Sequence, residues 1–351
     1  MMRFIRPGWH ASRHFARILS SCASIVLFSS IGSAQTDKEM EKIIEGAKKE
    51  GKVVYYGSTS STEANEMLRG FQRKYPFIKT DMYRAGSDTL MEKILIESRA
   101  GRHVADVYNL RAFTITVLVK RGLLAKNVSR HAVFFPNGYK DRDGHWVSFY
   151  QNPATFGYNA KLVSSSEAPK DWPDLLDPRW KGQMIMDREE SEWYANMLAV
   201  MGHDKGRAFM KRLAGQNIVF RAGHTLLAQL VAAGEHKIGV VLYTPRLEVM
   251  KAAGAPLEWA RAKPVISYHY SMGVAAQAPN PNAARLFMDY FLSKEGQELV
   301  AKLGRVPVRT DVKPNPPSLV EGVNLVPSDP AIADKDFQKY FEEYRKTFNV
   351  Q

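Results

Sequence analysis

The chain has 351 residues, of which 45% are hydrophobic and 24% are charged, a balance that is typical of globular proteins and excludes a largely disordered chain. This length is more than one typical domain needs and suits two. Basic residues number 49 against 36 acidic ones, a formal net charge of +13, yet no basic run is dense enough to indicate nucleic-acid binding. The excess of positive charge has two explanations, a basic surface with dispersed charges or the attraction of an anionic ligand.

The N-terminus has the pattern of a secretory signal. Several arginines and no acidic residue precede a short apolar run at Ala23–Ile31, which the small residues Gly32-Ser33-Ala34 follow. Because this run is too short to span a bilayer, we expect cleavage near Ala34, with a retained anchor as the alternative. Cys22, the sole cysteine, would be removed with the signal, so the mature chain would have no disulfide. Lipidation is not expected, because Cys22 precedes the apolar run.

The next part of the chain alternates helices with short apolar strands. Helices are predicted at Asp37–Glu50, at 61–75, from Ser87 through Leu95 and up to Arg121, and strands at Val53–Tyr56, Ile78–Tyr83 and Ala105–Tyr108. Ser60 and Glu63 have capping-box spacing at the second helix, and Ser87 is the expected cap of the third. This alternation predicts a largely parallel sheet with helices on both faces.

The rest of the chain has two long extended stretches, Trp146–Tyr158 and Val265–Ala276. Between them we predict strands at Gln183–Met186 and Ile238–Tyr243, and helices at Ser191–Met201, Asp204–Leu213 and Thr225–Ala233. Beyond them we predict a helix over Asn280–Leu303, a proline-rich loop at Asp311–Pro330 and a terminal helix at Asp334–Phe348. Two α/β units joined by two extended crossings predict a hinged pair with a cleft, in which the ends of strands face the ligand.

Several segments resemble one known family. They are Gly51–Gly57, Leu90–Tyr108, Trp172–Gly182, and Asn280–Gln297 followed by Gly304-Arg305-Val306-Pro307. In these segments the chain resembles the periplasmic solute-binding proteins of ABC importers, in their ferric-iron-binding-protein-like branch. The resemblance implies a type II clamshell of two lobes, each with a mostly parallel sheet flanked by helices. It also implies a periplasmic location, delivery to a permease in the inner membrane, and neither catalysis nor a cofactor.

The resemblance also suggests how the chain is divided. We expect a signal peptide at 1–34, lobe 1 at 35–150 plus 270–315, and lobe 2 at 151–269. The remaining residues, 316–351, are expected to form a loop and a helix that pack on the lobes. We expect a monomer that binds a small-molecule solute and no nucleic acid.

The residues that bind metal in iron-binding relatives are mostly replaced here. The resemblance places a His or an acidic residue in the first loop, a Glu after the third strand, and adjacent tyrosines after a strand of lobe 2. The chain has Gly57–Ser61 in the first loop, Arg111 near the second position, and Tyr243-Thr244 at the third. Hard Fe(III) prefers anionic oxygen ligands, so only Tyr243 fits a metal site.

Candidate ligand-binding residues follow from these patterns, and no catalytic residue or metal motif is predicted. They are the hydroxyl-rich loop Ser58, Thr59, Ser60 and Ser61; Arg111; the crossing residues Tyr150, Gln151 and Asn152; and Asp187, Arg221, His224, Thr225 and Tyr243 of lobe 2. Hydroxyls and N–H groups at a helix start, together with arginines, suit an anion. The alternatives are ordinary N-capping, surface arginines, packing tyrosines, hinge packing, and a solvated helix start at Asp187.

The resulting hypothesis is a binding protein that captures a small organic anion or zwitterion, with a carboxylate or phosphonate, and delivers it to a permease. The first alternative is ferric iron with a synergistic anion held by Arg111. A secreted enzyme or a sensory ligand-binding module on the same architecture also remains open.

Overall fold

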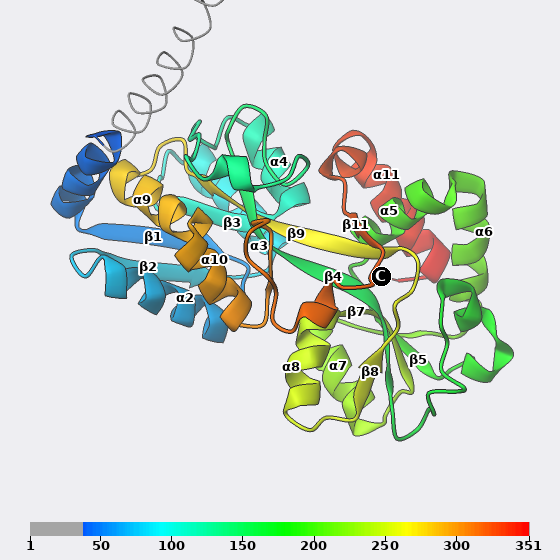
Figure 1. Ribbon diagram of the computed structural model, residues 1–351. Coiled ribbons are helices and arrows are strands. Elements are labelled where there is room, and N and C mark those ends of the chain that lie inside the picture. The colour runs from blue at the N-terminus through cyan, green and yellow to red at the C-terminus, as the bar shows by residue number, and fades with distance from the viewer. Residues whose placement is uncertain (1–37, 351) are drawn as a thin grey trace, which may run out of the picture.

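The computed structural model describes residues 38–350, without the side chains of 333–338 (Figure 1). The predicted signal peptide and Cys22 lie outside the described residues. In the described part, no helix is both long and apolar enough to cross a membrane.

One continuous sheet runs through the molecule, in the strand order β2-β1-β3-β9-β4-β7-β5-β6. These strands are β1 (Lys52–Gly57), β2 (Lys79–Arg84), β3 (Val107–Arg111), β4 (Val147–Asn159), β5 (Met184–Asp187), β6 (Val219–Arg221), β7 (Ile238–Tyr243) and β9 (Val265–Val274). The short strands β8 (Leu257–Trp259) and β10 (Val306–Pro307) pair with β4, and β11 (Leu325–Pro327) pairs with β9.

Two parallel groups of strands are joined by two long antiparallel strands. The strands β2, β1 and β3 are parallel, as are β7, β5 and β6. Between the groups, β9 is antiparallel to β3, and β4 is antiparallel to both β9 and β7. We call the first group with its helices lobe 1 and the second lobe 2. The chain thus forms the predicted two-lobed clamshell with two crossings, β4 and β9. The predicted lobe limits at 150/151 and 269/270 fall inside these two strands.

Helices cover both faces of each parallel group (Figure 1). A helix covers residues 38–50, and the others of lobe 1 are α2 (Ser61–Lys74), α3 (Ser87–Arg99), α4 (Ala112–Lys120), α9 (Pro281–Leu292) and α10 (Lys294–Lys302). Lobe 2 carries α5 (Ser191–Met201), α6 (His203–Ala214), α7 (His224–Ala233) and α8 (Thr244–Ala252). The terminal helix α11 (Pro330–Phe348) packs against α5 and α6 of lobe 2 and α4 of lobe 1. Short 3-10 turns lie at Ala132–Phe134, Trp172–Leu176, Pro178–Trp180 and Pro317–Leu319.

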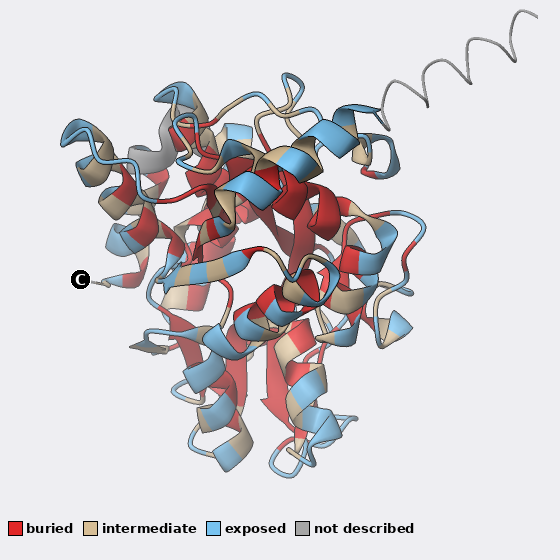
Figure 2. Ribbon diagram, turned by 90° about the vertical axis from the view of Figure 1, so that its left-hand side faces the viewer, coloured by how far each residue is buried: buried red, intermediate tan, exposed pale blue. Residues whose placement is uncertain are grey.

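Each helix faces the sheet with an apolar stripe. In α2, Ala64, Met67, Leu68 and Phe71 are buried at helical spacing, while the charged residues between them face solvent. Figure 2 shows this arrangement for the whole molecule, with buried strands inside and exposed outer faces on the helices. All residues of β4 and β9 are buried, because these strands are central in the sheet and covered on both faces.

The helix predictions need correction at four points. The single helix predicted over Asn280–Leu303 is two helices, because Ser293 is extended and its hydroxyl accepts a bond from Gly296 N, which caps α10. The capping box at Ser60 does not form, since its hydroxyl donates to the Glu63 carboxylate over 2.7 Å. Ser87 is not a cap, because it is the first residue of α3 and Gly86 precedes it, and α7 begins at His224, one residue before the predicted start at Thr225.

Candidate functional site

A cavity of about 420 Å³ lies between the lobes, beside the carboxyl ends of their parallel strands. Lobe 1 lines it with Ser58, Ser60, Arg84, Gly86, Ser87, Asp88, Thr89 and Arg111, and lobe 2 with Asp187, Glu189, Ala222, Gly223, His224, Thr225 and Tyr243. The crossing strands add Tyr150, Asn152 and Tyr270, and Arg305 lies just before β10. Its volume suits a small organic molecule held by both lobes.

Five helices begin at this cavity. The residues that precede α2, α3, α4, α7 and α8 all line it, namely Ser60, Gly86, Arg111, Gly223 and Tyr243. None of these residues accepts a side-chain capping bond from its own helix. Because the first N–H groups of a helix have no partner inside it, and the helix dipole is positive at that end, these starts favour negative charge between the lobes.

Two of the three cavity arginines are already paired with carboxylates. Arg111 lies 3.4 Å from Asp88 and 3.6 Å from Glu192, and only 15% of its side chain is exposed. Burial opposes its charged form, but these two carboxylates outweigh burial and raise the pKa of the guanidinium above its ordinary value. Arg305 pairs with Glu63 and also donates to Asn152 Oδ1 over 2.7 Å. Both arginines therefore meet a ligand with their charge largely compensated.

Arg84, the third arginine, is different. It is exposed at the end of β2, and its Nε donates to the backbone oxygen of Thr59 over 3.3 Å. Among the described residues, no carboxylate lies within ion-pair distance of Arg84. Its guanidinium is thus the uncompensated cation of the lobe 1 wall, next to the start of α3.

On the opposite wall, His224 belongs to a buried polar group. Its Nε2 lies 3.0 Å from Glu190 Oε1, and its Nδ1 lies 3.2 Å from the Val241 carbonyl oxygen. The Tyr268 hydroxyl donates to the other Glu190 oxygen. Burial lowers the pKa of His224, but Glu190 more than offsets this, so the pKa lies above its ordinary value. Both ring nitrogens face acceptors, which suits an imidazolium.

Aromatic rings line part of the cavity between the lobes. Tyr150 and Tyr270 stack with centroids 4.7 Å apart, and the Arg305 guanidinium lies 5.2 Å from the Tyr150 ring. Tyr243 stacks on the His224 ring with centroids 3.9 Å apart. Burial raises the pKa of Tyr150 and of Tyr243, so both are neutral phenols that can donate a hydrogen bond to a ligand.

The structure brings most of the predicted site residues to this cavity. Those that line it are Ser58, Ser60, Arg111, Tyr150, Asn152, Asp187, His224, Thr225 and Tyr243. Four others do not. Thr59 is buried, with its hydroxyl donating to Asn109 Oδ1 over 3.1 Å, and Ser61 is exposed in the first turn of α2. The side-chain oxygen of Gln151 accepts hydrogen bonds from the hydroxyls of Tyr139 and Ser267. Arg221 is exposed, and its Nη1 donates to the backbone oxygen of Phe220.

Sequence reasoning missed several residues that line the cavity: Arg84, Gly86, Ser87, Asp88, Thr89, Glu189, Ala222, Tyr270 and Arg305. Arg84 had a usable signal, because it directly follows the predicted strand Ile78–Tyr83, and ligands bind beyond such ends. Tyr270 and Arg305 come from distant parts of the chain, and no local pattern marks them.

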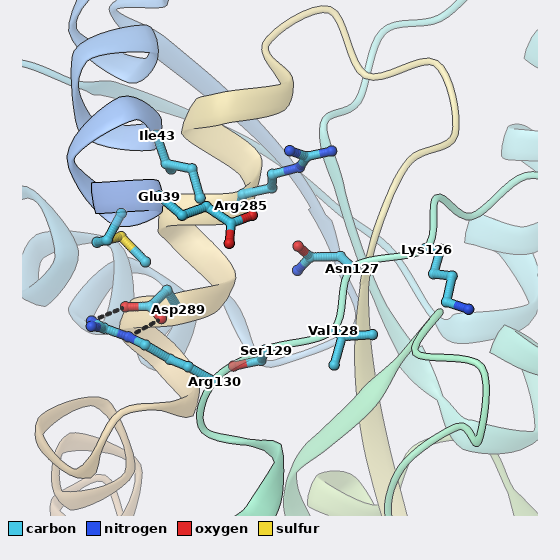
Figure 3. A pocket seen from close by; sticks show the side chains of 10 residues that line it. Glu39, Ile43, Lys126, Asn127, Val128, Ser129, Arg130, Arg285 and Asp289 are labelled. Carbon is cyan, nitrogen blue, oxygen red and sulfur yellow. Dashed lines mark hydrogen bonds and ion pairs between the residues drawn. The ribbon is translucent and has the colours of Figure 1, made fainter. Parts of the chain in front are cut away.

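Two other features lie outside this cavity. A hollow of about 370 Å³ on lobe 1 lies between the helix at 38–50, α9 and residues 126–130, and an ion pair between Arg130 and Asp289 spans part of it at 2.9 Å (Figure 3). Asp141, Asp143 and His145 form the only group of three His, Cys, Asp or Glu side chains in the described part whose ligand atoms are close enough to share one ion. None of these three residues lines the interlobe cavity.

The sequence profile of a family described as bacterial extracellular solute-binding protein matches residues 110–335. This chain belongs to that family. This solute-binding protein is 28% identical to an uncharacterised protein of Haemophilus influenzae. The alignment covers 84% of this chain and 87% of the relative. An Fe(3+)-binding periplasmic protein of Serratia marcescens is 23% identical over 71% of this chain and 75% of its own length. A putative 2-aminoethylphosphonate-binding periplasmic protein of Salmonella typhimurium is 24% identical over 58% of this chain and 63% of its own length.

Solved structures show the same fold. The periplasmic binding protein AfuA of Actinobacillus pleuropneumoniae, solved with fructose-6-phosphate bound, has a TM-score of 0.75 and 24% identity, covering 86% of this chain and 99% of its own. Iron-bound HitA of Pseudomonas aeruginosa has a TM-score of 0.74 and 18% identity. Its match covers 84% of this chain and 99% of its own. The solute-binding protein therefore has the type II periplasmic-binding-protein fold, which its relatives use for chemically different solutes.

Proposed function

We propose that this solute-binding protein captures a small organic anion or zwitterion, carrying a carboxylate or phosphonate, between its lobes and delivers it to the permease of an ABC importer. The observation that carries this proposal is the lobe 1 wall, where the uncompensated guanidinium of Arg84 lies beside the uncapped start of α3. A guanidinium and free backbone N–H groups together match the oxygens of such a group. The ligand after which the Salmonella relative is named, 2-aminoethylphosphonate, belongs to the same chemical class.

The cavity's donor set gives less support to ferric iron. An Fe(III) site needs several anionic oxygens converging on one point. Here burial raises the pKa of Tyr150 and of Tyr243 and holds both phenols neutral, and Arg111 and Arg305 bring permanent cations into the same cavity. Iron with a synergistic anion is the second candidate, because Tyr150, Tyr243 and Tyr270 line the cavity and the Serratia relative is described as iron-binding.

Titration calorimetry with small carboxylates and phosphonates, set against ferric citrate, tests the proposal on the signal-free protein. Micromolar or tighter binding of an organic anion, weakened by Arg84→Gln, is the expected result. Ferric binding with a visible tyrosinate absorption band, lost in Tyr243→Phe and without any organic ligand, would establish the second candidate instead. Mass spectrometry of the recovered ligand checks that it is returned unchanged, as a transport role without catalysis requires.

A further inference from the structure

The unpaired charges of the cavity are separated by lobe. On the lobe 1 wall Arg111 is compensated by Asp88 and Glu192, and Arg305 by Glu63, which leaves the charge of Arg84. The three helix starts on this wall contribute no full charge. Among the described residues, Arg84 is therefore the arginine of this wall that has no carboxylate partner.

The lobe 2 wall carries the opposite charge. Asp187 and Glu189 line the cavity after β5, and in the described part neither has a basic group within ion-pair distance. The two Asp187 oxygens accept bonds from the backbone N–H groups of Glu189 and Gly223, at 3.0 and 2.7 Å, so this carboxylate is held in place. Glu189 is exposed to the cavity and to solvent. Two carboxylates that no described basic group reaches at ion-pair distance thus line the same cavity as Arg84, from the other lobe.

We propose that the ligand is a zwitterion whose anionic group binds at Arg84 and the start of α3, and whose ammonium group binds between Asp187 and Glu189. This inference rests on the proposed function and narrows it to one ligand class. The anionic group of such a ligand compensates the charge of Arg84, and its ammonium group compensates the charge of the lobe 2 carboxylates. A ligand with two anionic ends would bring its second charge against the lobe 2 carboxylates, which costs affinity.

The surroundings of Glu189 support this assignment. Burial, followed by the like charges of Asp88 and Asp187, raises the pKa of Glu189, although the charges of Arg111 and Arg188 partly oppose the rise. Asp88 belongs to lobe 1, so carboxylates from both lobes repel one another here. An ammonium group at this point replaces repulsion by attraction and therefore favours the closed arrangement of the lobes.

Two matched pairs of probes test the proposal by titration calorimetry. 2-Aminoethylphosphonate is compared with ethylphosphonate, and β-alanine with propionate, because the members of each pair differ in the amine. We expect one zwitterion to bind at least about tenfold more tightly than its partner without the amine. Glu189→Gln should remove most of that difference and leave the affinity for the simple anion unchanged or higher, whereas Arg84→Gln should weaken both members. Glu298→Gln, which alters an exposed glutamate of α10 outside the cavity, is the control.

The outcomes separate this inference from the proposed function. If a simple anion binds as tightly as its zwitterion, the zwitterion inference is wrong and anion capture still holds. If the preference exists but Glu189→Gln leaves it intact, the assigned ammonium position is wrong. If none of the four probes binds at millimolar concentration while ferric citrate does, both proposals are overturned.

Discussion

The guanidinium of Arg111 in lobe 1 reaches the carboxylate of Glu192 in lobe 2, with Nη1 and Oε2 3.6 Å apart. Both side chains are mostly buried, with 15% and 7% exposed. Burial raises the pKa of Glu192, while the nearby Arg111 charge opposes this rise. The contact therefore ties the two lobes beside the cavity, and each partner depends on the other.

Replacing Arg111 with Gln should lower the free energy of unfolding by about 2 kcal/mol at pH 7, because Glu192 would stay buried without its cation. Urea unfolding measures this loss. The double variant Arg111→Gln with Glu192→Gln should recover most of it, and the loss should shrink as the pH falls through the raised pKa of Glu192 and its carboxylate takes up a proton. An equal loss in the exposed control Arg121→Gln would show that the cross-lobe pair has no special role.

His224 should make the protein less stable on the alkaline side. Its pKa is raised in the folded state by Glu190, so the stabilising charge pair is fully present below the ordinary histidine pKa of 6.5 and is lost as the pH rises through the raised value. We expect the free energy of unfolding to fall over that interval. His224→Gln should flatten this slope, whereas the exposed His103→Gln should keep it, as unfolding curves recorded between pH 6 and 9 will show.

His269 should make the protein less stable on the acidic side. It is buried in β9, with Nε2 2.8 Å from the Ser328 oxygen and Nδ1 2.7 Å from the Ser148 hydroxyl, and burial lowers its pKa to about 4. The unfolded chain takes up this proton near pH 6.5, so stability contributed by the neutral imidazole is lost as the pH falls toward 4, by up to about 3 kcal/mol. NMR titration of the imidazole gives the direct check, and a midpoint near 6.5 would contradict the prediction.

Asp106 should be important for folding rather than binding. Its carboxylate is buried and accepts bonds from Val54 N at 2.7 Å and from Asn280 N and Nδ2 at 2.7 and 3.0 Å, so it joins β1 to the start of α9. Asp106→Ala leaves these donors without a partner and should cost about 2–3 kcal/mol of unfolding free energy. Ligand affinity at temperatures where the variant is folded should stay within about twofold of the parent protein, since Asp106 does not line the cavity. A large loss of affinity would assign it a role at the site.

Much of the fold was predictable because it depends on local patterns. The strands that start each α/β unit, the apolar stripe of α2 and the two long extended crossings can all be read from the spacing of apolar residues. β6, a three-residue strand, lacked the length to be recognised. Residues at the ends of predicted strands, such as Tyr243, were accordingly placed at the cavity.

The predictions failed where a distant partner overrides a local rule. Ser60 has capping-box spacing with Glu63, but Arg305, 242 residues further along the chain, pairs with that glutamate. Arg111 was expected to be a free cation for the ligand, yet Glu192 reaches it from the other lobe. Such compensation depends on tertiary contacts, so no reading of either segment alone would reveal which arginine keeps its charge available.

The two crossing strands also determine how the clamshell can move. β4 and β9 are hydrogen-bonded to each other from Val147–Met272 to Ala154–Ile266, so the hinge is a two-stranded ribbon rather than a pair of loose linkers. Such a ribbon twists readily but resists sliding, because sliding would break its ladder of bonds. We therefore expect any opening and closing of the lobes to change the twist of this ribbon. We also expect the lobes of the empty protein to return to the angle at which the ribbon has its preferred twist.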